Sequence, residues 1–400
     1  MRVLIAAPEI DNSTSGPAYI AFKWAEALSK VCQLTVLGSE RPDQQPLAQQ
    51  LPGANVVTCP HSPSTQRYQW VRSRPRTNPS SFSRNLSQYL KRSRKQYDIA
   101  HMLVPKTAHD AIPFWKFALP YVIGPVGSRL LTQKTFTSER PLTFMQKNRL
   151  DTWRLRHDPW LRKSYAKARL VIGVAPFMRD MLADIPLQRF ETMLDFGIDR
   201  LAPLIARVPV PGQLRLLHVG RGIRSSGLRD TVRALSCLRD LPGITLTSAG
   251  GGEDIAECQA EAESLGVADR CTFLGHIPRY EVEALYASHD LFVFPSYQDS
   301  SCHVLYEAMR WGLPIVTTAR GTPGWIVDQT CGICIPVTNP SIFADEIALV
   351  IRAFVNDPAR RQILGQGARK KVLREALWSA KAIQMRKLYE DIIVEKSETR

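Results

Sequence analysis

Two carboxylates in this sequence lie on either side of the predicted start of a helix. Asp299 lies in the polar stretch YQDSS, and Glu307 follows it with seven residues between them. The apolar run LFVFP before this stretch predicts a short buried strand that ends at a loop. Apolar residues at helical spacing after the loop predict a helix that contains Glu307.

Such an arrangement can bind a phosphorylated ligand. Carboxylates near the start of a helix accept hydrogen bonds from ribose or sugar hydroxyls, and the first backbone amides of the helix attract a phosphate. The amides expected here belong to Ser301, Cys302, His303 and Val304. For an isolated Glu307, a solvated helix residue would be the ordinary interpretation.

The surrounding elements form a strand–loop–helix–strand unit over residues 291–327. Gly312 followed by Pro314 predicts the end of the helix, and the run PIVTT predicts the next strand. In βαβ units of this kind, ligands bind at the carboxyl ends of the strands and at helix N-termini.

The acidic-x7-Glu pair and the following run EAMRWGLPIVTT resemble the signature of the glycosyltransferase family 4 type. The resemblance implies an α/β fold of GT-B architecture, with two Rossmann-like doubly wound domains that face a cleft. It also implies a retaining transfer from a nucleotide-sugar, which is a co-substrate, with neither a metal nor another cofactor. In this family the donor phosphate itself is thought to accept the acceptor's proton, so that positioning and electrostatics determine the rate.

The same resemblance assigns the donor diphosphate to the loop after the strand predicted at 214–219. Gly220 and Arg221 match the family pattern in place, and Arg221 joins Asp299 and Glu307 as the catalytic set that the resemblance implies. Ser226 stands where the family has a lysine. Either Arg224 substitutes for that lysine, or the donor is held more weakly.

Other loops resemble donor-binding or acceptor-side positions. The triple glycine of Gly250, Gly251 and Gly252 follows a predicted strand, and Gly275 with His276 corresponds to backbone that meets the nucleobase. Gly16 remains in the first loop, where the following proline removes an amide donor, and a plain turn is an equally good interpretation. His101 and Gly127 are candidates for the acceptor side, although a lone histidine after a strand is more often structural.

The predicted domains follow from these elements. Residues 1–200 form the acceptor-side domain, 201–213 a proline-rich linker, 214–375 the donor-binding domain, and 376–400 a terminal helix that crosses back. Residues 41–85 are rich in Pro, Ser, Gln and Arg, which predicts a loosely structured insertion. The pair Asp158-Pro159 predicts a helix N-cap followed by proline at the first helical position.

The net charge of +15 is concentrated in two stretches. Residues 67–96 carry a net +9 and residues 129–169 a net +8, so that the rest of the chain carries −2. Trp70, Trp153 and Trp160 lie in these stretches, and tryptophan suits a membrane interface. The stretches therefore favour an anionic membrane surface and a glycan or lipid-linked acceptor; the alternative is a solvated face. Nucleic acid is not expected as a partner.

The remaining composition is that of an ordinary globular protein. Eight cysteines have no repeated spacing, and no apolar run approaches the roughly 18 residues of a membrane span. The expectation is a cytoplasmic protein, with peripheral binding at the inner face of the membrane. The competing hypothesis is a non-catalytic GT-B scaffold or nucleotide-sugar-binding protein. Three features favour it: the serine at 226, the proline at 17 in the first loop, and the absence of the family's histidine from the loop that ends at Ser128. A nicotinamide-dependent oxidoreductase is disfavoured because the first loop lacks G-x-G-x-x-G.

Overall fold

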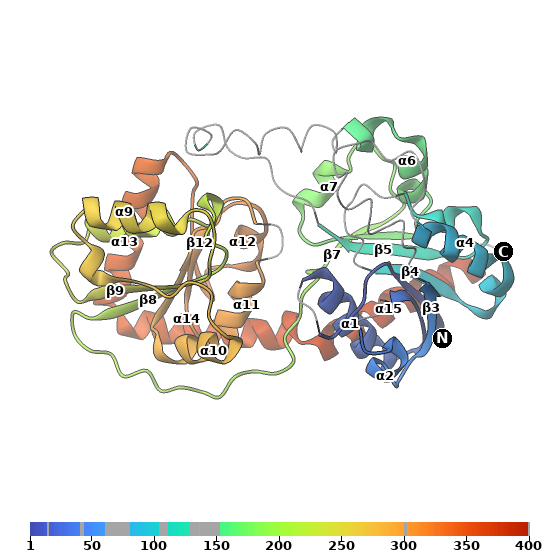
Figure 1. Cartoon of the computed structure of the whole chain (residues 1–400), viewed down its shortest axis with the longest axis horizontal. Helices are drawn as coiled ribbons and strands as arrows, with labels where there is room; N and C mark the ends of the chain where they lie inside the picture. The colour runs from blue at the N-terminus through green and yellow to red at the C-terminus, as the bar shows by residue number, and fades with distance from the viewer. Residues whose placement is uncertain are drawn as a thin grey trace. The chain divides into compact units, whose positions relative to one another are not determined.

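The computed structural model of the 400-residue chain forms two compact units (Figure 1). Unit 1 comprises Met1–Ser128, Gln146–Phe196 and Trp378–Arg400, and unit 2 comprises Arg129–Met145 and Gly197–Leu377. The structure describes residues 1–13, 16–40, 44–60, 81–103, 111–127, 136, 153–299 and 302–398.

Unit 1 is built on a parallel sheet of seven strands in the order β3-β2-β1-β4-β5-β6-β7. The strands are β1 (Arg2–Ala7), β2 (Gln33–Glu40), β3 (Asn55–Pro60), β4 (Ile99–Leu103), β5 (Tyr121–Val126), β6 (Leu170–Gly173) and β7 (Phe190–Thr192). The helices that cover it include α1 (Pro17–Ser29), α2 (Leu47–Gln50), α4 (Ser81–Ser93), α6 (Pro159–Ala166), α7 (Phe177–Met181) and α15 (Trp378–Glu398). The central strands are buried on both faces and are therefore almost continuously apolar.

The C-terminal helix α15 packs on the first helix of unit 1. Trp24 of α1 lies edge-on to Trp378 with ring centroids 5.4 Å apart, and its indole Nε1 donates to the carbonyl of Asp195 at 2.6 Å. Lys381 of α15 donates to the carbonyl of Leu194 at 2.8 Å. These contacts join the last segment of the chain to the first within one core.

Unit 2 has a parallel sheet of six strands in the order β10-β9-β8-β11-β12-β13. The strands are β8 (Leu214–Val219), β9 (Ile244–Ala249), β10 (Cys271–Phe273), β11 (Leu291–Phe294), β12 (Ile315–Thr318) and β13 (Gly332–Ile335). The helices include α8 (Leu228–Ser236), α9 (Ile255–Ser264), α10 (Arg279–Ser288), α11 (His303–Arg310), α12 (Gly321–Ile326), α13 (Pro340–Asn356) and α14 (Pro358–Lys371). One turn of π-helix, Val372–Ala376, follows α14.

The order of the strands fixes where a ligand can bind. In unit 2 the chain runs outward from β8 through β9 and β10, and then returns to the other side of β8 to form β11. Loops that follow β8 and β11 therefore diverge, which leaves a crevice at the carboxyl ends of these two strands. Unit 1 has the equivalent switch between β1 and β4.

Several local predictions can be compared with the structure. Asp158 is the N-cap of α6 and accepts from the backbone amides of Trp160 and Leu161, which confirms the cap predicted at this position. Gly312 follows α11 with a φ of 73°, as expected of a glycine that ends a helix. The prediction of a loosely structured insertion over 41–85 is wrong where the structure describes it, because α2 and the start of α4 lie in it and β3 pairs with β2 at the edge of the sheet. Residues 41–43 and 61–80, with Trp70, lie outside the described residues.

The first part of the second basic stretch, Arg129–Met145, belongs to unit 2, although the sequence placed this stretch in the first domain; of this part the structure describes Phe136. Phe136 is fully buried in the core of unit 2, with its ring 4.5 Å from that of Tyr297 and 6.1 Å from that of Phe343. The described residues include no helix that is both long and apolar enough to cross a membrane.

Candidate active site

Three glycine turns meet at the carboxyl ends of β8, β9 and β10. Gly220 donates its amide to the carbonyl of Ala249 at 3.0 Å, and Gly250 donates to the carbonyl of Gly275 at 2.7 Å. Gly222 donates to the carbonyl of Gly251 at 2.9 Å. Gly250 has a φ of 125°, and a Cβ at this position would overlap the Gly220 carbonyl, so only glycine fits. The structure thus brings the predicted donor-binding glycines of three loops together.

The loop after β8 is stabilised by a hydrogen bond between two of its own residues. The Ser226 hydroxyl donates to the carbonyl of Arg221 at 2.7 Å, and Ser226 is buried. Gly227 adopts a left-handed conformation and begins α8, and a Cβ there would overlap the carbonyl of Pro295. The serine that replaces the expected lysine therefore shapes the loop and does not reach outward as a cation would.

Arg224 is held in a buried ion pair. Its guanidinium donates to both carboxylate oxygens of Asp230, at 2.6 and 2.8 Å, and also lies over the rings of Phe136 and Tyr297. Arg224 is 5% exposed and Asp230 is fully buried. The fork-to-fork geometry is a strong, orienting interaction that fixes the loop after β8. This favours a structural role for Arg224 over substitution for the missing lysine.

Arg221 differs from Arg224 in its surroundings. Its side chain is exposed, and within the described part of the chain it has no carboxylate partner. It follows Gly220 directly at the end of β8, beside the crevice that the strand order predicts. An exposed guanidinium at this point is available to pair with the oxygens of a phosphate.

The loop after β11 carries the first carboxylate of the pair. Asp299 accepts a hydrogen bond from the Cys302 amide at 3.3 Å, which places this carboxylate at the start of α11. Cys302 itself has a φ of 48°, and among the described residues it is the one non-glycine residue with a positive φ. Strain of this kind persists where the surrounding structure enforces it, and it occurs often at ligand sites. Ser301 lies outside the described residues.

Hydrogen bonds tie this loop to its neighbours on both sides. The Ser296 hydroxyl donates to the carbonyl of Ser225 at 3.0 Å, and the Tyr297 hydroxyl donates to the carbonyl of Arg224 at 3.2 Å. On the other side, Thr318 donates to the carbonyl of Ser296 at 2.6 Å. The loops after β8 and β11 and the last residue of β12 are therefore joined by hydrogen bonds at the switch point.

The second carboxylate, Glu307, lies one turn into α11 and is positioned by a buried tyrosine. Tyr286 of α10 donates its hydroxyl to Glu307 Oε2 at 3.3 Å, while Glu307 Oε1 is 3.9 Å from the exposed guanidinium of Arg279. Burial raises the pKa of Tyr286 well above its usual range, so the tyrosine remains a donor. The Glu307 side chain is 22% exposed and can accept further hydrogen bonds.

Sequence reasoning missed Tyr286, and it also missed Arg320, whose guanidinium donates to the carbonyl of Tyr297 at 3.3 Å. Neither residue carries a signal in the sequence, because each acts by supporting a neighbouring element. His276 is exposed after β10, while His303 and Val304 begin α11 and are half-buried.

The predicted acceptor-side residues lie in unit 1 and differ in accessibility. His101 is completely buried in β4, between the hydroxyl of Tyr389 at 2.5 Å and the carbonyl of Gly124 at 2.9 Å. Burial lowers the pKa of His101 to about 4. This favours the structural interpretation of His101. Gly16 has a φ of 76° and open space around it, and Gly127 directly follows β5 and is half-buried.

A known family of domains matches most of unit 2. Residues 207–371 match the family described as Glycosyl transferases group 1, so the chain contains a domain of this family. This confirms the resemblance found in the sequence.

Two curated relatives each match part of the chain. The glycogen synthase of Mycobacterium tuberculosis (strain H37Rv) is 32% identical over 202 residues, which cover 50% of this chain and 48% of the relative. The lipopolysaccharide glucosyltransferase WaaG of Escherichia coli (strain K12) is 36% identical over 122 residues, 30% of this chain and 32% of WaaG. The chain thus spans about half of the first relative and a third of the second.

Solved structures match over nearly the whole chain. Anabaena Alr3699/HepE in complex with UDP gives a TM-score of 0.68 at 15% identity, covering 98% of this chain and 100% of the other. A structure of WaaG gives 0.57 at 18% identity, covering 97% and 99%. These likenesses show that the fold is that of the GT-B glycosyltransferases, as predicted.

Proposed function

We propose that the protein is a retaining glycosyltransferase that binds a nucleotide-sugar at the switch point of unit 2. The observation that carries the proposal is that the loop after β8, which holds Arg221, is hydrogen-bonded at the switch point to the loop after β11, which holds Asp299 and leads into the helix of Glu307. A cation, two carboxylates and a helix start at one crevice suit a ligand that combines a diphosphate with sugar hydroxyls.

Each residue has a role in this proposal. The Glu307 carboxylate, held by Tyr286, accepts hydrogen bonds from ribose hydroxyls. Arg221 pairs with the diphosphate and stabilises the negative charge that develops on the leaving group. Asp299 and the first amides of α11 bind the transferred sugar and the neighbouring phosphate. The glycine turns at 220, 250 and 275 let the nucleoside approach the backbone closely.

The proposed reaction is a front-face displacement at the anomeric carbon. The bond from this carbon to the phosphate oxygen breaks, and a bond to the acceptor hydroxyl oxygen forms on the same face. The acceptor's proton passes to the departing phosphate, so the reaction needs neither a basic side chain nor a metal ion. The UDP complex of Alr3699/HepE supports a uridine nucleotide as the first donor to test.

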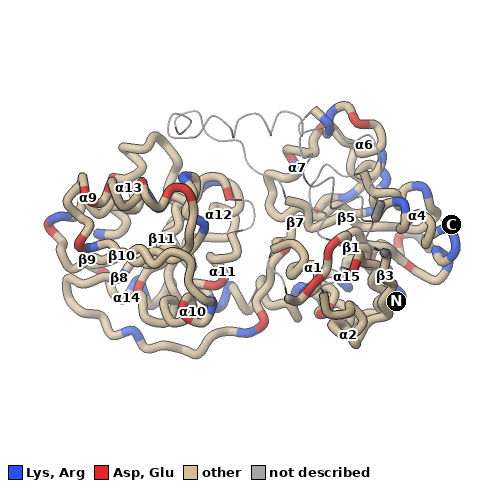
Figure 2. The backbone as a smooth tube through the Cα atoms, viewed as in Figure 1, with Lys and Arg blue, Asp and Glu red and all other residues tan. Residues whose placement is uncertain are grey.

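The acceptor is proposed to be a glycan or a lipid-linked glycan precursor that is handled at an anionic membrane surface in the cytoplasm. WaaG, a relative in part of its length, is named for lipopolysaccharide. In unit 1, Trp115 stacks on Trp160 at 5.4 Å, and Lys116 and Lys163 lie over the Trp115 ring. Lys and Arg lie along α4 and around α6 (Figure 2). Exposed tryptophans among cations suit an anionic interface.

The proposed activity can be tested with a panel of nucleotide-sugars. Purified protein should release nucleotide from one donor, faster when a suitable acceptor is present, and NMR of the product should show a retained anomeric configuration. Binding of a nucleotide without turnover of any donor would instead favour a nucleotide-sugar-binding scaffold, which the replacement of the expected lysine by Ser226 supports. An inverted product would contradict the front-face mechanism.

A further inference from the structure

His218 is a buried, ionisable side chain of unit 2 that the proposed mechanism does not use. It lies in β8, two residues before Gly220, and is 1% exposed. Successive side chains of a strand point to opposite faces, so His218 shares its face with Leu214 and Leu216, which belong to the core of unit 2. A polar ring on this otherwise apolar face needs a hydrogen-bond partner, because its burial without one is unfavourable.

The partner of His218 is the loop that follows its own strand. The imidazole Nε2 lies 3.2 Å from the carbonyl oxygen of Ser226. Because a carbonyl oxygen can only accept, Nε2 carries the hydrogen and donates it. Burial lowers the pKa of His218 to about 4, so the ring is neutral at neutral pH. His218 is therefore a fixed hydrogen-bond donor to the loop after β8.

Ser226 continues this connection to Arg221. The hydroxyl of the buried Ser226 donates to the carbonyl of Arg221 at 2.7 Å, and the Ile223 amide donates to the same carbonyl at 2.8 Å. In the described part of the chain, Ser226 is the one side chain that hydrogen-bonds the backbone of Arg221. The two donors restrict the rotation of this peptide group, because a carbonyl oxygen has two lone pairs to satisfy. The exposed guanidinium of Arg221 thus extends from backbone that is held in place.

The hydrogen bonds from the loop after β11 act further along. They reach the carbonyls of Arg224 and Ser225, three and four residues beyond Arg221. They join the two loops, but they do not hold the peptide group of Arg221. The side chains that hold it are Ser226 directly and His218 through Ser226.

We propose that His218 is a positioning residue for the donor site: through Ser226 it fixes the backbone of Arg221 and thereby aims that guanidinium at the donor diphosphate. The inference rests on the proposed function, because it takes Arg221 to stabilise the leaving group. Neither His218 nor Ser226 gives up a proton in the reaction, since each acts as a fixed hydrogen-bond donor. Their contribution arises because a cation stabilises the transition state only where the negative charge develops.

Turnover of a nucleotide-sugar by matched variants tests the proposal. Ser226→Ala removes the hydroxyl alone, and His218→Phe keeps an aromatic ring without its donor. Each should lower kcat about tenfold or more, while the donor KM changes less than about threefold, because the lost interaction belongs to the transition state. His218→Gln keeps a donating nitrogen at a similar reach and should recover most of kcat.

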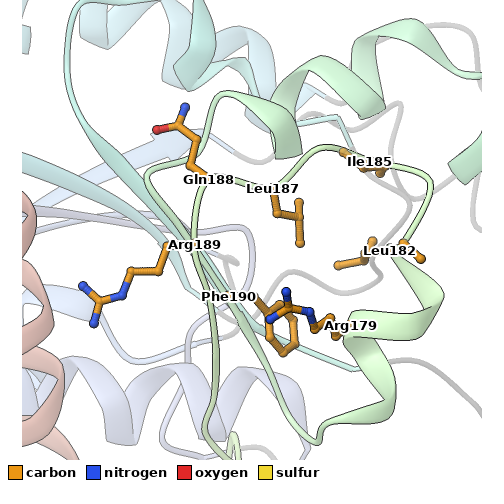
Figure 3. A pocket seen from close by; sticks show the side chains of 8 residues that line it. Arg179, Leu182, Ile185, Leu187, Gln188, Arg189 and Phe190 are labelled. Carbon is orange, nitrogen blue, oxygen red and sulfur yellow. The ribbon is translucent and has the colours of Figure 1, made fainter.

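Two control variants remove comparable hydrogen bonds elsewhere. The Ser236 hydroxyl donates to the carbonyl of Arg233 at 2.7 Å at the end of α8, so Ser236→Ala loses a bond of the same type and length in unit 2. Gln188 borders a pocket of unit 1 (Figure 3) and donates to the carbonyl of Ala166 at 3.3 Å. Ser236→Ala and Gln188→Ala should both keep full kcat.

Combination with Arg221→Ala distinguishes positioning from a general loss of structure. In the Arg221→Ala background, Ser226→Ala should change kcat less than about twofold, because the group that it positions is absent. The same loss of kcat in both backgrounds would overturn the inference. Full kcat for both Ser226→Ala and His218→Phe would overturn it as well.

Hydrogen exchange without any ligand separates this inference from the proposed function. The amides of residues 221–227 should exchange severalfold faster in Ser226→Ala and His218→Phe than in the unaltered protein, and at the unaltered rate in Ser236→Ala. Unchanged exchange in Ser226→Ala and His218→Phe would overturn the inference, whether or not UDP binds. Faster exchange, combined with no binding of UDP to the unaltered protein, would count against the glycosyltransferase alone, because the loop would still depend on His218.

Discussion

At the scale of single residues, Glu307 is the most direct test of donor binding. Its carboxylate is positioned by Tyr286 and remains partly exposed. Glu307→Ala should weaken UDP binding by about 1.5–3 kcal/mol, or roughly 10- to 150-fold, because a charged hydrogen bond is lost. Calorimetry measures the affinity, and Glu257→Ala on the exposed face of α9 is the matched control. An unchanged UDP affinity would remove Glu307 from the donor site.

A second residue-scale prediction concerns the buried histidines. Burial lowers the pKa of both His101 and His218 to about 4. Between pH 6.5 and about 4 the unfolded chain therefore binds protons that the folded protein does not, so the free energy of unfolding falls as the pH falls through this window. The expected slope is about 1.4 kcal/mol per pH unit for each histidine. Above pH 6.5 this contribution to stability is fully present.

Urea unfolding at several pH values between 7 and 4.5 measures this slope. His101→Gln should lower stability at pH 7, because its hydrogen bonds to Tyr389 and Gly124 are altered, yet it should reduce the pH dependence of unit 1. A variant with the same pH dependence as the unaltered protein would show that His101 is not the group responsible.

The sequence predicts the positions of some site residues and not the contacts of others, because only local patterns are visible in a sequence. The positions of Asp299 in a loop and of Glu307 in a helix were predictable because their spacing relative to a strand and a helix is local. The ion pair of Arg224 was not predictable, because nothing in the sequence distinguishes its partner Asp230 from any other acidic residue in the first turn of a helix. The ion pair becomes evident only when the burial of both side chains is known. Tyr286 likewise acts across two helices, which no local pattern records.

At the scale of elements, the buried pair of Arg224 and Asp230 tests what holds the loop after β8. Asp230→Ala leaves a buried guanidinium without its carboxylate and should destabilise the protein by about 3–5 kcal/mol. Arg224→Met with Asp230→Leu replaces both charges by apolar groups and should recover much of that loss. Thermal unfolding gives the stabilities, and UDP calorimetry gives the function of the loop.

The double variant also decides between two roles for Arg224. If it folds and binds UDP with nearly the affinity of the unaltered protein, Arg224 is structural, as its geometry indicates. A folded double variant that no longer binds UDP would restore the direct phosphate-binding role that the sequence suggested.

Composition predicted some elements correctly and failed to predict strand β3. The unit from β11 to β12 was predictable because apolar runs are bounded by Pro295 and Gly312. Strand β3 was missed because its run NVVTC stands between segments rich in proline, serine and glutamine. As an edge strand, β3 needs only one pairing partner, and a short apolar run is enough to form it.

At the scale of the whole molecule, the distribution of charge predicts docking to anionic membranes. Co-sedimentation with vesicles that contain phosphatidylserine should recover the protein at low salt, and recovery should fade as salt screens the lysines and arginines. Trp153→Ala with Trp160→Ala should reduce recovery severalfold, because two exposed indoles are lost. Trp325→Ala, an exposed tryptophan of unit 2, is the control. Equal recovery with anionic and neutral vesicles at low salt would contradict docking.

The central claim is that unit 2 transfers a sugar from a nucleotide donor with Arg221 on the diphosphate, and turnover of Arg221→Ala tests it most directly. With the preferred nucleotide-sugar, kcat should fall about 10²–10³-fold, because the charge on the leaving group loses its partner. The melting temperature should hardly change, since the side chain is exposed. Arg239→Ala, another exposed arginine of unit 2, should keep full activity. Full turnover by Arg221→Ala would contradict the account.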